Sequence, residues 1–121
     1  MSRNLMAILR GVTPSEVVAL GEQLLQAGIH QIEVPLNSPN ALESIAKLHN
    51  ALGEQAIIGA GTVLNVADAK AVYAHGGEFI VSPNANTDVI KATKDMCMMS
   101  YPGVLTPTEC FAALDSGADV L

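Results

Sequence analysis

Apolar and polar residues follow two different periods along this chain, and the two periods alternate. Short runs typical of strands occupy residues 6–9, 31–36, 56–62, 79–82, 96–100 and 118–121. Between them lie longer runs whose apolar residues recur every three or four positions, as on one side of a helix. The pattern therefore predicts a strand followed by a helix five times over, and then the start of a sixth unit.

Capping signals predict where the helices begin. Thr13-Pro14-Ser15-Glu16 and Thr106-Pro107-Thr108-Glu109 each combine an N-cap threonine, a proline at the first helical position and the glutamate of a capping box. The other three helices are expected to begin at Ser38-Pro39, at Asn65 and at Asn86 or Thr87. The five helices should end near residues 28, 53, 76, 94 and 117.

Regular alternation of strands and helices indicates a parallel sheet, and two architectures use it: a doubly wound open sheet and an eight-stranded barrel. An open sheet needs apolar residues at both alternating sets of strand positions, because helices cover both faces. Here one set carries Arg10 or Ala7, Glu33 and the glycines of the third strand, which favours a barrel interior. We therefore expect an α/β fold of the (β/α)₈ barrel type. Residues 1–121 would be the N-terminal portion of a single domain, about five and a half of its eight units.

Glu33 lies in the second predicted strand, where its direction matters. Ile32, Val34 and Leu36 would face the covering helices, so Glu33 would face the opposite side of the sheet. Inside a barrel, a carboxylate must be hydrogen-bonded, paired or functional, because burying it alone is very costly. Alternatively, the strand lies at an edge of the sheet and Glu33 simply contacts water.

Composition and charge limit the possible partners. Half of the 121 residues are hydrophobic, which suffices for one domain with a core of useful size. The net charge of -6 argues against nucleic acid or an anionic membrane as a partner, since both attract clusters of Lys and Arg. The sequence has neither an apolar run of membrane-spanning length nor the apolar core of a signal peptide, so we expect a cytoplasmic protein.

Neither the cysteines nor the histidines have the spacing of a metal site. Cys97 and Cys110 both lie in apolar segments and are expected to be reduced core residues. His30, His49 and His75 do not form a ligand set. We therefore expect neither a metal nor another cofactor.

Chemistry in parallel α/β proteins gathers where strands end and helices begin. Three residues there offer complementary groups, namely the guanidinium of Arg10, the carboxyl group of Glu33 and the hydroxyl of Thr62. Each alone has a simpler explanation, because an Arg after a strand is more often a surface charge and Gly-Ala-Gly-Thr is more often tight packing. Their convergence on one rim nevertheless makes them the candidate site. The same rim also holds Asn37, Pro83, Asn84 and Pro102-Gly103.

Five segments, at residues 7–11, 32–39, 58–64, 80–84 and 102–109, resemble in order and spacing the signatures of the 2-dehydro-3-deoxy-phosphogluconate and phosphogalactonate aldolases. The resemblance implies a (β/α)₈ TIM barrel, usually assembled as a homotrimer. It also implies cleavage of a phosphorylated 2-keto-3-deoxy sugar acid to pyruvate and glyceraldehyde 3-phosphate, through a lysine Schiff base and without a metal. The alternatives are a non-catalytic partial barrel that binds a sugar acid or pyruvate, and a doubly wound binding domain.

The resemblance also implies roles for particular residues. Glu33 would be the general acid–base group, Arg10 would contact the substrate carboxylate and Thr62 would bind pyruvate. Asn37 stands where the gluconate-specific branch commonly has an Arg, which together with Arg10 and Pro35 favours the phosphogalactonate branch.

The lysine of the Schiff base would be the residue after Leu121, so we expect this chain alone to be inactive. The family's phosphate-binding glycine loops, which follow the seventh and eighth strands, would also lie outside it. The four lysines within the chain fall on predicted helices and are expected to lie on solvent-exposed faces: Lys47, Lys70, Lys91 and Lys94. The apolar edges at residues 6–9 and 120–121 predict a fragment that is marginally stable or oligomeric.

Overall fold

The computed structural model describes residues 3–121, in which five strands alternate with five helices. The strands are β1 (Arg3–Ile8), β2 (Ile29–Pro35), β3 (Ile57–Gly61), β4 (Phe79–Ser82) and β5 (Met99–Pro102). The helices are α1 (Val17–Gln26), α2 (Ala41–Leu52), α3 (Val66–Ala74), α4 (Thr87–Asp95) and α5 (Pro107–Asp115). The predicted alternation of strands and helices is confirmed.

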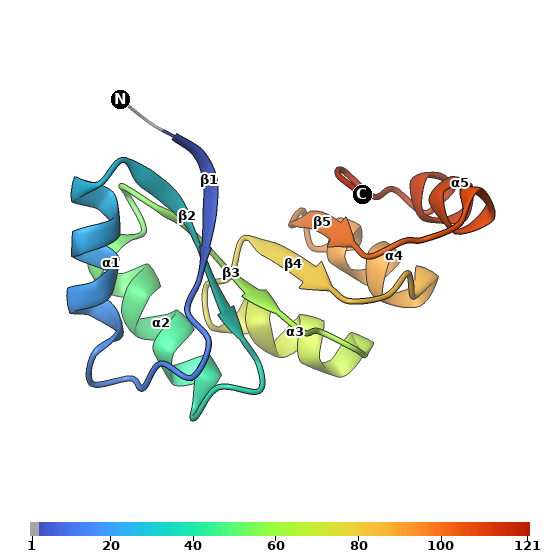
Figure 1. Cartoon of the computed structure of the whole chain (residues 1–121). Helices are drawn as coiled ribbons and strands as arrows, with labels where there is room; N and C mark the ends of the chain where they lie inside the picture. The colour runs from blue at the N-terminus through green and yellow to red at the C-terminus, as the bar shows by residue number, and fades with distance from the viewer. Residues whose placement is uncertain (1–2) are drawn as a thin grey trace.

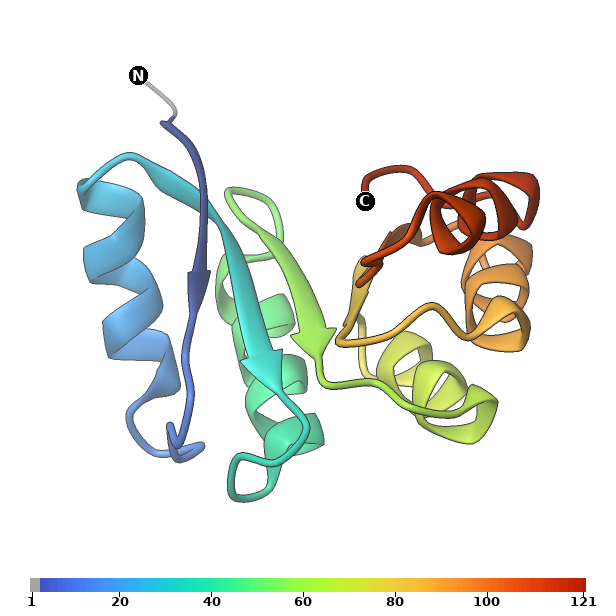
Figure 2. The ribbon, with the colours of Figure 1, turned by 45° about the vertical axis from the view of Figure 1, so that its right-hand side comes forward.

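The five strands are parallel and lie side by side in the order in which they occur along the chain. A doubly wound sheet instead reverses its strand order at a switch point. Figure 1 and Figure 2 show that the sheet curls, with helices along its outer side. The structure therefore confirms the barrel-type architecture over the doubly wound alternative, and the five strands form a curled half-barrel.

The main core lies between the outer face of the sheet and the helices. Alternate strand residues point into it and are at most 1% exposed: Ile32, Val34, Ile58, Ala60 and Ile80. They share one buried cluster with helix residues such as Ile45, Leu48 and Val72. Each large apolar side chain buried in this way contributes about 1.5–3 kcal/mol relative to exposure. The prediction that Ile32 and Val34 face the covering helices is therefore confirmed.

The two predicted capping boxes differ in the structure. At α5 the Glu109 N–H donates to the Thr106 hydroxyl at 3.3 Å, and the Thr106 N–H donates to the Glu109 carboxylate at 2.8 Å. At α1 the Thr13 hydroxyl donates to the Glu16 carboxylate at 2.9 Å, and the helix begins only at Val17. The capping box predicted at Thr13–Glu16 is wrong, because the Glu16 N–H donates to the Thr13 carbonyl in a turn that precedes the helix.

The predicted cap of α2 is also wrong. The helix begins after Asn40, which has a φ of 47° and makes no side-chain cap. The Ser38 hydroxyl instead accepts a hydrogen bond from the Gly11 N–H at 3.0 Å, so it is committed to the loop after β1. Asn65 and Asn86 cap α3 and α4 as predicted.

The fifth strand begins later than predicted, at Met99 instead of Met96. Cys97 has a φ of 60°, and its N–H donates to the Lys94 carbonyl at 2.9 Å as α4 ends. Glycine usually occupies such a left-handed position, so nothing in the sequence signals this turn. Cys97 is consequently exposed. Cys110, on α5, is only half-buried, so the predicted core positions of both cysteines are wrong.

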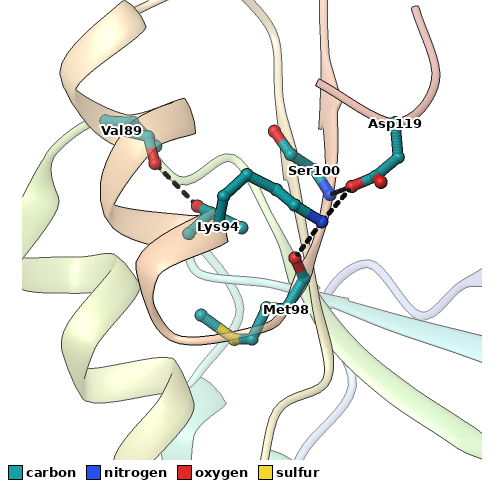
Figure 3. Close-up of polar contacts among 6 residues, drawn as sticks. Val89, Lys94, Met98, Ser100 and Asp119 are labelled. Atoms are coloured by element: carbon teal, nitrogen blue, oxygen red, sulfur yellow. Dashed lines mark hydrogen bonds and ion pairs between the residues drawn. The ribbon is translucent and has the colours of Figure 1, made fainter. Parts of the chain in front are cut away.

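Residues 118–121, predicted to begin a sixth strand, form no strand. They still lie beside β5, because the N–H groups of Asp119 and Val120 donate to the Ser100 carbonyl at 3.0 and 3.2 Å. The Asp119 carboxylate accepts hydrogen bonds from the Ser100 N–H at 2.8 Å and the Lys94 ammonium at 2.6 Å (Figure 3). Lys94 also donates to the Met98 carbonyl at 2.9 Å, so one ammonium group links α4 to the residue before β5 and to the segment after α5.

We expect the substitution D119N to lower the free energy of unfolding by about 1 kcal/mol near neutral pH, since the ion pair is partly exposed. Burial raises the pKa of Asp119, but the hydrogen bonds from Lys94 and the Ser100 N–H outweigh it and hold the pKa below its ordinary 3.8. A carboxyl group of lowered pKa stabilises the fold above its unfolded-state pKa. This contribution is lost as the pH falls through the folded-state value.

Urea denaturation at about pH 7 and about pH 2 measures the difference between wild type and D119N. The difference should be larger at the higher pH. The matched control is D95N, because Asp95 is an exposed acid on α4. An equal loss in D119N and D95N would show that the hydrogen bonds of Asp119 contribute nothing to stability.

Candidate active site

Glu33 lies on the interior face of the sheet, near the carboxyl end of β2. It is in register with Ile8 on β1 and Gly59 on β3, so β2 has a neighbour on both sides. Glu33 is 4% exposed, and its alternation with Ile32 and Val34 directs it away from the main core. The alternative that Glu33 lies on an edge strand is therefore wrong.

Two glycines of β3 provide the space that the interior side chains occupy. A side chain on Gly61 would collide with the carboxyl group of Glu33, and one on Gly59 would collide with the ring of Phe79. The Phe79 ring packs edge-on against Tyr101, with ring centroids 5.8 Å apart. The glycines of the third strand therefore share the face of Glu33, as predicted, and allow its carboxyl group to lie close to the backbone of β3.

Arg10 occupies the turn after β1, beside the strand that carries Glu33. The Leu9 N–H donates to the Glu33 carbonyl at 2.9 Å, and the Val12 N–H closes the turn on the Leu9 carbonyl at 3.3 Å. The Arg10 side chain is exposed and forms no ion pair with Glu33 in the described part of the chain. Its positive charge nevertheless lowers the pKa of Glu33.

The carboxyl group of Glu33 has the properties of a proton carrier. Burial raises the pKa of Glu33 because it disfavours the charged form, and the positive charge of Arg10 offsets this only in part. No hydrogen bond from residues 3–121 contributes to the pKa. A buried carboxyl group with a raised pKa is a candidate for general acid–base chemistry.

Thr62 directly follows β3 and has a left-handed backbone, with a φ of 57°. For a β-branched residue this conformation costs about 1–3 kcal/mol, and such strain clusters at functional sites. Hydrogen bonds of the next residue hold the loop: the Val63 N–H donates to the Val81 carbonyl at 3.2 Å, and the Ser82 hydroxyl donates to the Val63 carbonyl at 2.7 Å. The sequence predicts the position of Thr62 on the rim but gives no sign of its strain.

The other rim positions divide into exposed and packing residues. Asn37 and Asn84 are exposed at the ends of their strands. Gly103 is a packing residue, because its N–H donates to the Ser82 carbonyl at 2.9 Å and a side chain there would collide with the Pro83 carbonyl. Glu33 and Thr62 are brought together through Gly61, and Arg10 lies in the neighbouring loop. The sequence-based search did not find Ser38 and Ser82, because their partners are backbone groups distant in sequence.

The four lysines all lie on helices, away from the interior face. Lys47 pairs with Glu43 at 3.3 Å, Lys94 pairs with Asp119, and both remaining lysines are exposed. Within residues 3–121, no group of three or more His, Cys, Asp or Glu residues could hold a metal ion. No helix in this part of the chain is both long enough and apolar enough to cross a membrane.

The sequence matches a known family over nearly its whole length. The family model described as "Aldolase: KDPG and KHG aldolase" matches residues 2–121. The 2-dehydro-3-deoxy-6-phosphogalactonate aldolase of Escherichia coli (strain K12) is 43% identical over 117 residues, which cover 97% of this chain and 57% of that relative. This chain therefore spans little more than half the length of that relative.

Solved structures match the fold. A structure described as "Native KDPGal structure" has a TM-score of 0.94 at 42% identity, over 98% of this chain and 57% of the other. A KDPG aldolase from Legionella pneumophila, solved with pyruvate captured at low pH as a covalent carbinolamine intermediate, has a TM-score of 0.83 at 28% identity, over 94% of this chain and 54% of the other. The curled sheet and its helices thus share the TIM-barrel-like fold of these proteins.

We expect alanine to have different effects at the two glycines of β3. In G61A the new methyl group displaces the flexible end of Glu33, so the free energy of unfolding should change by less than about 1 kcal/mol. In G59A the methyl group meets the Phe79 ring, which is 1% exposed, and the loss should be about 1–3 kcal/mol. Urea denaturation measures both losses. A larger loss in G61A than in G59A would contradict this assignment of space.

We expect E33Q to raise the free energy of unfolding by about 1 kcal/mol near neutral pH, because glutamine carries no charge to bury. The pKa of Glu33 is raised, so its contribution to stability is fully present below the unfolded-state value, ordinarily 4.5, and is lost as the pH rises through the folded-state value. The gain in E33Q should therefore disappear in acid. Denaturation across this pH range, with the exposed-loop variant E54Q as control, measures it. A gain that persists below the unfolded-state pKa would point to packing instead of charge.

Proposed function

The chain belongs to the KDPG and KHG aldolase family, and on this premise we propose that the protein cleaves a 2-keto-3-deoxy-6-phospho sugar acid to pyruvate and glyceraldehyde 3-phosphate through a Schiff base. The observation that carries the proposal is the carboxyl group of Glu33, which is buried, raised in pKa and without an internal hydrogen bond to residues 3–121. The galactonate epimer is the favoured substrate, because a relative of 43% identity is named for it and Asn37 replaces an Arg common in the gluconate branch.

The proposed reaction needs an electron sink next to the bond that breaks. Condensation of the substrate keto group with a lysine amine releases water and forms an iminium ion. Removal of the proton from the C4 hydroxyl then sends the electrons of the C3–C4 bond into the iminium. This step releases glyceraldehyde 3-phosphate and leaves the enamine of pyruvate. Protonation of the enamine and hydrolysis return the free amine and pyruvate.

Glu33 supplies the proton transfers in this scheme. Its carboxyl group gives a proton to the hydroxyl that leaves during dehydration, and as a carboxylate it accepts the proton of the C4 hydroxyl. Its raised pKa supports both roles, because burial makes the protonated form easier to reach than in an ordinary glutamate. The guanidinium of Arg10 pairs with the substrate carboxylate, and the hydroxyl of Thr62 donates a hydrogen bond to the pyruvate part of the substrate.

We also propose that residues 1–121 are the N-terminal portion of a single (β/α)₈ domain, with the nucleophilic lysine outside them, so that the 121-residue chain alone is inactive. Apolar side chains exposed at the two open sides support this proposal, since further barrel units would cover them: Leu5, Ile8, Phe111 and Leu114. The complete protein is a cytoplasmic homotrimer in this proposal. Its partners are the sugar acid and pyruvate, with no nucleic acid and no membrane.

Trapping with borohydride tests the Schiff base. After incubation with pyruvate and borohydride, intact mass spectrometry should show a reduced pyruvate adduct on a polypeptide longer than 121 residues and none on the 121-residue chain. Peptide mapping then locates the adduct. An adduct on any of the four lysines of residues 1–121 would overturn the proposed position of the nucleophile.

A coupled assay tests the activity of the complete protein. Pyruvate release, followed with lactate dehydrogenase and NADH, should be faster from the phosphogalactonate substrate than from the gluconate epimer. The substitution E33Q should lower kcat by about 10²–10⁴-fold, the usual contribution of a general acid–base group, whereas E54Q should not. If the complete protein binds pyruvate but gives neither adduct nor turnover, it is a non-catalytic binding barrel.

A further inference from the structure

Ser38 is a buried serine that joins two loops of the rim. It follows β2, is 6% exposed, and accepts a hydrogen bond from the Gly11 N–H at 3.0 Å. Its partner lies 27 residues earlier in the chain, in the turn that carries Arg10. Ser38 makes no cap for α2, so this contact is the role that the structure gives its hydroxyl.

The hydrogen bond of Ser38 acts on the central peptide of the turn Leu9–Val12. The Val12 N–H closes this turn on the Leu9 carbonyl, which makes Arg10 and Gly11 its two central residues. Gly11 has a φ of 77°, the value that a type II turn places at its third position. The central peptide is free to rotate in an isolated turn, whereas here the Gly11 N–H is held in one direction. Because Arg10 forms one half of this peptide, holding the Gly11 N–H also holds the backbone from which the Arg10 side chain extends.

The loop that carries Ser38 is itself anchored on the other side. The Ser38 N–H donates to the Pro35 carbonyl at 2.9 Å, and the Leu36 N–H donates to the Gly61 carbonyl of β3 at 2.9 Å. A continuous series of hydrogen bonds therefore runs from Gly61 to Ser38 and on to Gly11. It connects the end of β3, next to Thr62, with the loop after the strand of Glu33 and with the turn that carries Arg10.

We propose that Ser38 is a positioning residue. It fixes the Arg10–Gly11 peptide and thereby keeps the Arg10 guanidinium near Glu33. The hydroxyl of Ser38 does not contact substrate in this proposal. It acts through Arg10 alone, and its removal frees the turn from the loop after β2 so that the guanidinium can move away.

The electrostatic consequence is measurable at Glu33. The groups that face Glu33 from the adjoining strands are Ile8 on β1 and the uncharged Gly59 and Gly61 on β3. The positive charge that lowers the pKa of Glu33 is that of Arg10. If the guanidinium moves away, the effect of burial is less opposed and the pKa of Glu33 rises.

The experiment is a carboxyl ¹³C NMR titration of Glu33 in this chain, with E33Q to assign the signal. R10Q should raise the pKa of Glu33, and S38A should raise it by at least half as much. S38A should add nothing in the R10Q background, because Ser38 acts only through Arg10. S38T, which keeps the hydroxyl, should have the wild-type pKa of Glu33, whereas S38V should not. This pair also replaces S38A if that variant fails to fold.

The matched control is S82A, which removes a buried serine hydrogen bond from the Thr62 loop without touching the Arg10 turn. It should leave the pKa of Glu33 unchanged even if it lowers stability as much as S38A. An unchanged pKa of Glu33 in S38A and S38V, or a further rise when S38A is added to R10Q, would overturn the proposal.

The inference rests on the proposed function only for the catalytic and binding roles that it gives to Glu33 and Arg10. The titration needs no turnover, so failure of the aldolase assay would leave it standing.

Discussion

The alternation of side chains along β2 is the constraint on which the rest of this structure depends. Ile32 and Val34 are fully buried against the helices, and the backbone geometry of a strand then directs Glu33 to the interior face. A shift of register by one residue would exchange the two faces and place the carboxylate in the apolar core. The same apolar packing that stabilises the sheet therefore fixes the direction of the functional group, and Gly61 provides the space for it.

Two features of the rim cost stability, and both lie near Glu33. One is the buried carboxyl group itself, whose pKa burial raises. The other is the left-handed backbone of Thr62, which a β-branched residue adopts only under restraint. The restraint comes from the hydrogen bonds of the next residue, in which the Val63 N–H donates to the Val81 carbonyl and the Ser82 hydroxyl donates to the Val63 carbonyl. Packing of the apolar core thus offsets this loss of stability, while the hydrogen bonds between loops fix the positions of the groups that cause it.

The sequence predicts the features that are local and periodic. The five strand–helix units, the caps at Asn65, Asn86 and Thr106, and the inward direction of Glu33 all follow from patterns within a few residues. The errors have different physical causes. Ser38 has the composition of a cap but bonds across the rim, and Cys97 adopts a turn conformation usually reserved for glycine. A single sequence also contains no signal for the strain at Thr62, because backbone strain depends on what surrounds the residue.

The separation of Arg10 from Glu33 is itself informative about the chemistry. A guanidinium in direct contact would lower the pKa of a carboxyl group by about 1–3 units and hold it ionised, which would prevent it from donating a proton. At a greater distance the same charge only moderates the effect of burial, and the net pKa of Glu33 remains raised. Arg10 is then still available to pair with a substrate anion, because it is exposed and not committed to Glu33. In the proposed mechanism Glu33 carries protons and Arg10 binds the substrate anion, so the anchored turn that carries Arg10 keeps two groups of opposite charge on one rim without pairing them.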